Sequence, residues 1–159
     1  MEVMVARLDS VCKYICEKGG WKVSNLQLQK VLYLAQMIYM GRNDGEPLTQ
    51  AKFEAWDYGP VEPTVYRKVR MFGSAPIQDV FFEALNFKNE SPRKRFLDEA
   101  CEYLLPLRAG QLVEIIHWNG GAWAKYYEPG IRGINIPNAD ILREYSDRIR
   151  DGNLEDKPH

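Results

Sequence analysis

Histidine and cysteine are scarce in this sequence, and their scarcity counts against metal sites. The 159 residues hold two histidines and three cysteines. Structural zinc needs four ligands, usually with a close pair of cysteines in a loop. Cys12 and Cys16 lie instead on or near the apolar stripe of a predicted helix, where cysteine behaves as a small buried hydrophobe. We therefore expect no metal site.

Long apolar runs are missing as well, which bears on the compartment. The longest run, VLYLAQMIYM at 31–40, has ten residues and includes Gln36, so it is too short and too polar to span a bilayer. The N-terminal segment carries Glu2 and Asp9 and lacks a long apolar stretch, so we expect no signal peptide. An odd number of cysteines without the spacing of a secreted disulfide framework indicates a reducing compartment. The expected location is the cytoplasm.

Catalytic motifs are also absent. The sequence contains no GxSxG, P-loop, HExxH or GxGxxG pattern. His117 has no nucleophile motif nearby, and His159 ends the chain. The adjacent carboxylates Asp98 and Glu99 are typical of a solvated helix face. We expect no enzyme and no catalytic residue. The alternative is a pocket around His117, which would require carboxylates to converge on it from elsewhere in the chain.

Charge of one sign is not in excess. The formal net charge is −1 and the sequence pI is near 6.2, so no overall positive field favours nucleic acid. Two short basic runs remain, RKVR at 67–70 and PRKR at 92–95. Because phosphate contacts from such runs are conceivable, a nucleic-acid-binding regulator of its own operon is the alternative function. No aromatic RNA-binding motif or recognition helix accompanies these runs.

What the sequence does contain is mainly helical periodicity. We predict helices over 2–18, 24–40, 63–72, 92–105, 109–118 and 138–149, strands over 53–58 and 131–136, and a short strand followed by a loop within 77–87. The fold class is mainly α (α+β): five or six helices around a central apolar helix, with a small antiparallel sheet of two or three strands. We expect one domain over residues 1–150 and a flexible tail over 151–159.

The second predicted helix has the clearest start signal. Ser24 is a good N-cap, and Gln27 at the third helical position can reach back to the cap amide, which makes a capping box. Val23 and Leu28 occupy the two positions of a hydrophobic staple. Apolar residues cover nearly the whole circumference of this helix, so it should lie in the centre of the fold.

The stretch FEAWDYGPVEPTVY, residues 53–66, combines large aromatic side chains with a rigid backbone. We predict a strand that Gly59 and Pro60 bring to an end. Pro63 suits the first turn of a new helix, since its missing N–H would have had no partner there. Glu62 then falls at or near the N-cap, where a negative charge is favourable.

Such a stretch is typical of a structural corner whose outer edge binds a partner. Trp, Tyr and Arg are enriched among binding hot spots, and a stiff surface loses less conformational entropy on docking. We expect Trp56 to point mostly inward, with Tyr58, Glu62 and Arg67 the most exposed. The candidate partner-binding residues are Trp56, Tyr58, Glu62, Tyr66, Arg67 and Arg70.

Three segments resemble the Panacea domain, the SocA-like antitoxin family, which includes phage-associated proteins. They are LQLQKVLYLAQ at 26–36, FEAWDYGPVEPTVY at 53–66, and the element from His117 to Trp123. The last helix, ILREYSDRI, is similar to the closing segment of the family, so the resemblance spans about residues 5–149. The central motif is the most specific of them. Ala122 stands where the family often has Pro, after Gly120 and Gly121.

The resemblance implies a bacterial or prophage type II antitoxin that binds and neutralises a co-encoded toxin protein by direct contact. It implies no cofactor and no catalytic residue, and it does not identify the toxin. We expect Gln29 and Lys30, polar residues on an otherwise apolar helix, to form hydrogen bonds with the loop at 57–62. The motif residues assigned a structural role are Gln29, Lys30, Tyr33, Gly59, Pro60, Val61, Pro63, His117 and Trp123.

Overall fold

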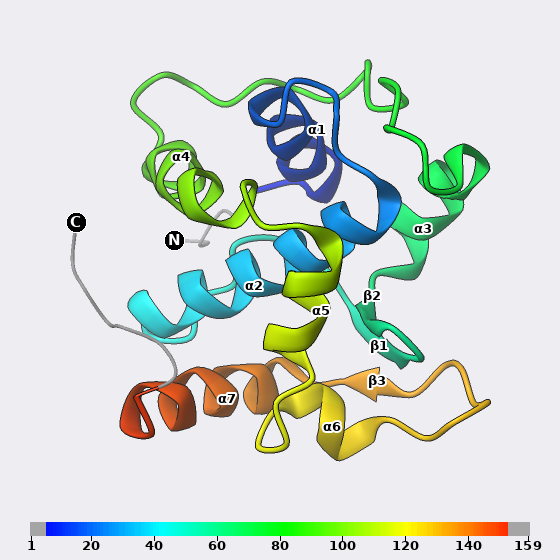
Figure 1. The fold of residues 1–159 in the computed structure, drawn as a ribbon. Helices are drawn as coiled ribbons and strands as arrows, with labels where there is room; N and C mark the ends of the chain where they lie inside the picture. Colours follow the sequence, from blue (N-terminus) through cyan, green and yellow to red (C-terminus); the bar gives the residue numbers. More distant parts are fainter. Residues whose placement is uncertain (1–5, 153–159) are drawn as a thin grey trace.

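The computed structural model describes residues 6–152, and residues 1–5 and 153–159 lie outside the described part of the chain (Figure 1). The predicted start of the first helix and most of the predicted tail fall in those two ranges. The helices are α1 Leu8–Lys18, α2 Asn25–Arg42, α3 Pro63–Val69, the 3-10 helix η1 Arg70–Phe72, α4 Pro92–Leu104, α5 Ala109–Ile116, α6 Ala122–Tyr126 and α7 Asn138–Arg150. The strands are β1 Phe53–Trp56, β2 Gly59–Val61 and β3 Asn135–Ile136.

The predicted α+β class is confirmed, with a small antiparallel sheet beside a mainly helical body. Within residues 6–152 there are seven α-helices, where five or six were predicted. The additional helix is α6, a single short turn after Gly121 that the sequence pattern did not indicate. No helix in the described range combines the length and apolar character that crossing a membrane requires.

Helix α2 is the centre of the fold, as predicted from its apolar circumference. Every residue from Leu28 to Met40 is buried. Figure 1 shows α2 running through the middle of the molecule, with α1 and α4 on one side, α7 on the other and α5 crossing it. A helix enclosed in this way must satisfy its polar side chains internally. Gln36 does so by donating to the carbonyl of Thr49 at 3.0 Å and accepting the Thr49 amide at 3.1 Å.

The start of α2 is only partly as predicted. The Ser24 hydroxyl oxygen accepts the backbone N–H of Gln27 at 3.2 Å, which confirms the N-cap. The capping box is wrong, because no hydrogen bond from the Ser24 N–H to the Gln27 side-chain oxygen is present in the described range. Gln27 Nε2 donates to the carbonyls of Leu105 and Leu107 at 3.0 and 3.1 Å. Carbonyl groups at a helix C-terminus lack intrahelical partners. Leu105, the C-cap of α4, and Leu107 just after it supply such acceptors for the Gln27 amide nitrogen.

The sheet has the order β2-β1-β3, with β1 antiparallel to both neighbours. Gly59 and Pro60 were predicted to end a strand, but they belong to β2, which pairs back on β1 with Trp56 opposite Gly59. The turn is formed by Asp57 and Tyr58 alone. Pro60 is tolerated because β2 is an edge strand, where a residue without an N–H leaves no ladder bond unmade.

Two other predicted strands are wrong or too long. Residues 77–87 form no strand, although Ile77 and Phe81 are buried and the Ile77 amide donates to the Val23 carbonyl at 2.8 Å. Of the strand predicted at 131–136, only Asn135–Ile136 is present. A strand extends only where a neighbour offers a ladder of hydrogen bonds. Here β1 pairs with just this short segment.

Candidate functional site

The central aromatic motif lines a groove with a volume of about 620 Å³. We call it the motif groove. It lies between the N-terminal turn of α2, the β1–β2 turn and α3, and the loop before β3 contributes one residue from far along the chain. The side chains that matter most for its chemistry are Asn25, Lys30, Trp56, Tyr58, Tyr66 and Arg132.

Gln29 and Lys30 attach the motif to α2, as predicted. The Gln29 side chain donates to the Glu62 carbonyl at 3.2 Å and accepts the Glu62 amide at 2.7 Å. The Lys30 ammonium donates to the Pro60 carbonyl at 2.8 Å. Gly59 is required where the lysine passes, because its φ is +114° and a Cβ there would lie 3.0 Å from Lys30 Cε. These contacts fix the hairpin on the central helix.

Lys30 is an unusual cation, because it is fully buried without a counter-charge. Its side chain has no exposed surface, and this loss of hydration lowers its pKa to about 7. Within residues 6–152, no carboxylate lies within 4.0 Å of the Lys30 ammonium. A buried charge with only a carbonyl partner carries a large desolvation cost. Such a site favours the arrival of a negative group.

Trp56 forms one wall of the motif groove, and its predicted inward orientation is wrong. Along β1, Phe53 and Ala55 are buried, whereas Trp56 lies on the opposite, half-exposed face. This follows from the two-residue period of a strand. The indole ring lies edge-on to Tyr66 at 4.9 Å between centroids, and the Arg132 guanidinium lies 4.1 Å from the centre of the Trp56 ring. The aromatic surface is therefore available on the outside of the hairpin.

The other candidate contact residues are placed as follows. Tyr58, at the tip of the β1–β2 turn, is 70% exposed. Arg67 and Arg70 are exposed on α3 and η1, and Tyr66 is partly buried against Trp56. We use the name hairpin face for the five candidates that the hairpin, α3 and η1 carry with some exposure: Trp56, Tyr58, Tyr66, Arg67 and Arg70.

Glu62 does not belong to the hairpin face, and its predicted exposure is wrong. The side chain is 3% exposed. One carboxylate oxygen accepts the backbone N–H groups of Thr64 and Val65 at 2.7 and 3.3 Å, so Glu62 is the N-cap of α3. The other accepts the Lys52 amide at 2.9 Å. Both oxygens are occupied inside the protein, which leaves none for a partner.

A stack of three aromatic rings is hydrogen-bonded to the end of β1 and to the β1–β2 turn. His117 lies parallel to Trp123 with ring centroids 3.9 Å apart, and Trp123 stacks on Tyr127 at 4.5 Å. The Trp123 indole N–H donates to the Trp56 carbonyl at 2.7 Å, and the Tyr127 hydroxyl donates to Asp57 at 2.6 Å. Residues more than sixty positions apart in the chain therefore hold the turn in place.

The contact that His117 makes in this stack is one of ring packing against Trp123. The Nε2 atom of His117 is buried without a hydrogen-bond partner. Burial, and after it the nearby positive charge of Lys30, lower the His117 pKa, so the ring is neutral at pH 7. No hydrogen bond or ion pair joins His117 to a carboxylate in the described part of the chain. The convergence that a catalytic pocket would need is not present there.

A buried carboxylate that sequence reasoning missed joins the motif helix to the end of the chain. Glu144 accepts the Tyr33 hydroxyl at 2.8 Å, the Ala122 amide at 3.0 Å and Arg148 Nε at 2.7 Å. Arg148 also donates to the Ile115 carbonyl at 2.6 Å. The signal was available as an i, i+4 Glu–Arg pair on the last helix. Tyr33 therefore acts by linking α2 to α6 and α7.

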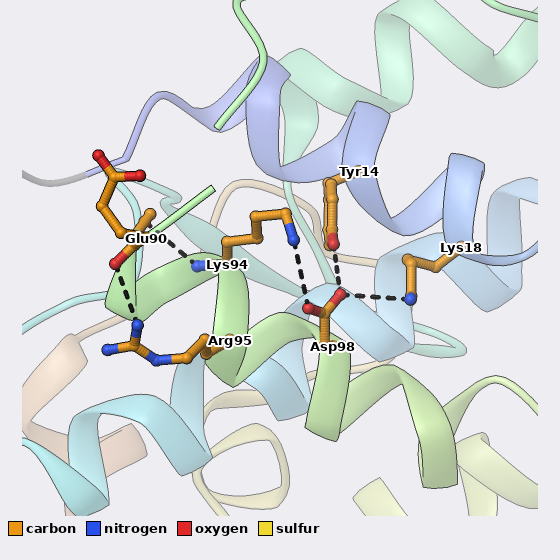
Figure 2. A network of polar contacts seen from close by, with 7 residues as sticks. Tyr14, Lys18, Glu90, Lys94, Arg95 and Asp98 are labelled. Carbon is orange, nitrogen blue, oxygen red and sulfur yellow. Dashed lines mark hydrogen bonds and ion pairs between the residues drawn. The ribbon is translucent and has the colours of Figure 1, made fainter. Parts of the chain in front are cut away.

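Asp98 and Glu99, expected to face water, are partly exposed and also pair with cations. Figure 2 shows Asp98 on α4 between Lys18 and Lys94, at 3.2 and 3.6 Å, with the Tyr14 hydroxyl donating to the same carboxylate. These contacts lower the Asp98 pKa against the opposing effect of burial, whereas burial and the hydrogen bond to Asp98 raise the pKa of Tyr14 well above its usual range. The network joins α1 to α4.

The basic run at 92–95 is held largely by the protein itself. Lys94 pairs with Asp98, and the Arg95 guanidinium donates to the Glu90 carbonyl at 3.1 Å (Figure 2). Arg93 donates to the carbonyls of Leu48 and Pro47 at 3.2 and 3.1 Å. Since these three cations already have partners, the run does not form a free phosphate-binding patch. The nucleic-acid alternative gains no support from it.

The described residues contain no group of three or more His, Cys, Asp or Glu side chains placed to hold a metal ion. Cys12, Cys16 and Cys101 are free and buried. Burial raises the pKa of all three thiols, to about 12 for Cys16 and Cys101. Because the thiolate is the reactive form, these cysteines are inert core residues at neutral pH.

Comparison with known proteins points to one family. Residues 28–124 match the family model described as antitoxin SocA-like, Panacea domain. The protein named Antitoxin SocA from Caulobacter vibrioides (strain NA1000 / CB15N) is 36% identical over 110 residues, which cover 64% of this chain and 58% of that protein. The chain thus spans less than two thirds of the length of this relative. No solved structure matches the chain.

Proposed function

The chain belongs to the SocA-like antitoxin family with the Panacea domain, and from this premise we propose that it is the antitoxin of a type II toxin–antitoxin system. It binds a toxin protein encoded next to it, in a bacterial or prophage operon, and blocks the toxin by direct contact in the cytoplasm. The match over residues 28–124 is the observation that carries this proposal. That range includes most of α2, the hairpin, and His117 and Trp123 of the aromatic stack.

The hairpin face is the surface we propose for toxin binding. It presents Trp, Tyr and Arg side chains, the types most enriched in binding hot spots. The hairpin beneath it is attached to α2 through Gln29 and Lys30 and to α6 through Trp123. Because these contacts hold the backbone before binding, little conformational entropy is lost on docking. Neutralisation then depends on stoichiometric binding and involves no turnover.

Co-expression with each neighbouring gene tests the proposal. The wild-type chain is expected to relieve growth arrest by one neighbour and to co-purify with its product. Replacing Tyr58 and Arg67 together by Ala should weaken this binding by about tenfold or more, as for two hot-spot side chains. Arg143→Ala, an exposed position on α7 outside the hairpin face, is the matched control. The proposal fails if no neighbouring product binds or is neutralised.

A further inference from the structure

The motif groove carries an imbalance of charge. Its ionisable lining side chains include Lys30, Arg132 and Asp57. Asp57 already accepts the Tyr127 hydroxyl at 2.6 Å. Lys30 bonds a carbonyl, and Arg132 lies over the Trp56 ring. Neither cation has a carboxylate within 4.0 Å in the described range.

The N-terminal turn of α2 adds to the positive character of the motif groove. Asn25 and Leu26 are the first two residues of an 18-residue helix, and their N–H groups have no intrahelical acceptor. The helix dipole places partial positive charge at this end. Asn25 also has a buried Oδ1 atom without a hydrogen-bond partner. A ligand that suits this end of the groove brings a negative group and, beside it, an N–H donor.

The volume of about 620 Å³ lies in the range of small-ligand pockets, so it has room for a few side chains and not for a whole helix. The rings of Trp56, Tyr58 and Tyr66 supply apolar surface next to the cations. A short protein segment fits this combination, because it offers a carboxylate, an apolar neighbour and a main-chain N–H within a few atoms of one another.

We propose that the motif groove receives an Asp or Glu side chain of the partner protein, flanked by apolar residues that pack on the aromatic wall. This inference rests on the proposed function, since it names the chemistry by which the toxin is recognised. The partner's carboxylate faces the α2 N-terminus and Arg132, with the buried charge of Lys30 beneath. The free protein has already lost the hydration of Lys30, so less desolvation remains to be overcome when the carboxylate binds.

A matched pair of peptides tests this without knowledge of the toxin. Acetyl-Leu-Glu-Leu-amide and acetyl-Leu-Gln-Leu-amide differ only in the charge of the central side chain. In ¹H–¹⁵N NMR titrations of the ¹⁵N-labelled full chain, the Glu peptide is expected to shift the amides of Asn25 and Leu26 and the Trp56 indole. The Gln peptide should bind at least about tenfold more weakly. Equal affinities, or no shifts in the motif groove, would overturn the proposal.

Two variants locate the interaction. Arg132→Gln changes an exposed loop residue and should leave the fold intact, whereas Lys30→Met removes the buried charge; the folding of both is checked by thermal unfolding. Each is expected to weaken binding of the Glu peptide by about fivefold to tenfold. Arg143→Gln on α7 removes a charge of the same type outside the groove and should change nothing. Unchanged affinity in folded Lys30→Met and in Arg132→Gln would also overturn the proposal.

The toxin itself separates this inference from the proposed function. Once a neutralised neighbour is found, each of its Asp and Glu residues is replaced by the matching amide. One replacement should weaken the complex in wild type but have little further effect in Arg132→Gln, as in a double-mutant cycle. If neutralisation survives both groove variants undiminished, the groove inference fails while the antitoxin function stands. If the Glu peptide binds but no neighbour is neutralised, the antitoxin function fails instead.

Discussion

Replacing Lys30 by Met should change how the stability of the protein depends on pH. Burial lowers the Lys30 pKa from its ordinary 10.5 to about 7 in the folded protein. Between these two values the unfolded chain keeps the proton that the folded chain has lost. Stability rises with pH wherever the unfolded state binds more protons. The free energy of unfolding of the wild type should therefore increase as the pH rises above 7, and Lys30→Met should lack this contribution.

The magnitude follows from the same two pKa values. A group that titrates at about 7 when folded and 10.5 when unfolded contributes about 2 kcal/mol between pH 7 and pH 9. The His117 pKa is lowered from 6.5, so the contribution of that residue lies mainly below this window. The three buried thiols, whose pKa values are raised, act in the opposite direction near pH 9. Their effect is common to both proteins and cancels in the difference.

Urea unfolding at pH 7, 8 and 9, followed by far-ultraviolet circular dichroism, measures this difference directly. Arg143→Gln serves as the control for the loss of one positive charge, because that side chain is exposed on α7. We expect the wild type and the control to gain about 2 kcal/mol relative to Lys30→Met across the window. Parallel pH profiles for all three proteins would refute the assignment of a perturbed, uncompensated cation at this position.

Three further substitutions test the contacts around the groove. Glu62→Ala removes the cap of α3 and should cost about 1–2 kcal/mol in urea unfolding, whereas a surface role would leave stability unchanged. Trp123→Phe replaces the indole by a smaller aromatic ring and removes the N–H donated to the Trp56 carbonyl. We expect a loss of at least about 1 kcal/mol and faster hydrogen exchange in the hairpin, and unchanged exchange would contradict the contact. Glu144→Ala leaves Arg148 buried and unpaired, and should lower the unfolding free energy by about 3–5 kcal/mol; a loss below about 1 kcal/mol would contradict this account of the network.

The contacts of the hairpin were predicted from the sequence only in part. The attachment of Gln29 and Lys30 to the loop at 57–62 followed from their polarity on an apolar helix. Glu62 was expected at the cap of α3, which is confirmed, and also on the surface, which is wrong. A cap is a local arrangement of a few residues. The burial of the same side chain depends on Lys52 and on the segments that cover it.

The family itself was identified from the sequence, and the comparisons confirm it. Arg132, by contrast, lies in a loop without a motif or a period, so no local pattern indicated that it stands over Trp56. No local pattern indicated α6 either. The hydrogen-bond acceptor of the Trp123 N–H could not be predicted from residue types, because it is a main-chain carbonyl.

Signals that act within about one helical turn could be recognised in the sequence: the cap Ser24, proline at the start of α3, and the apolar circumference of α2. Their free energy comes from neighbours a few residues away, so the local sequence is enough to predict them. The acceptors of the Gln27 side chain are carbonyls 78 and 80 residues distant, and the motif groove arises where α2, the hairpin and the β3 loop meet. Buried polar groups take whichever partner the packed chain brings within reach, and that choice exists only after the core has formed.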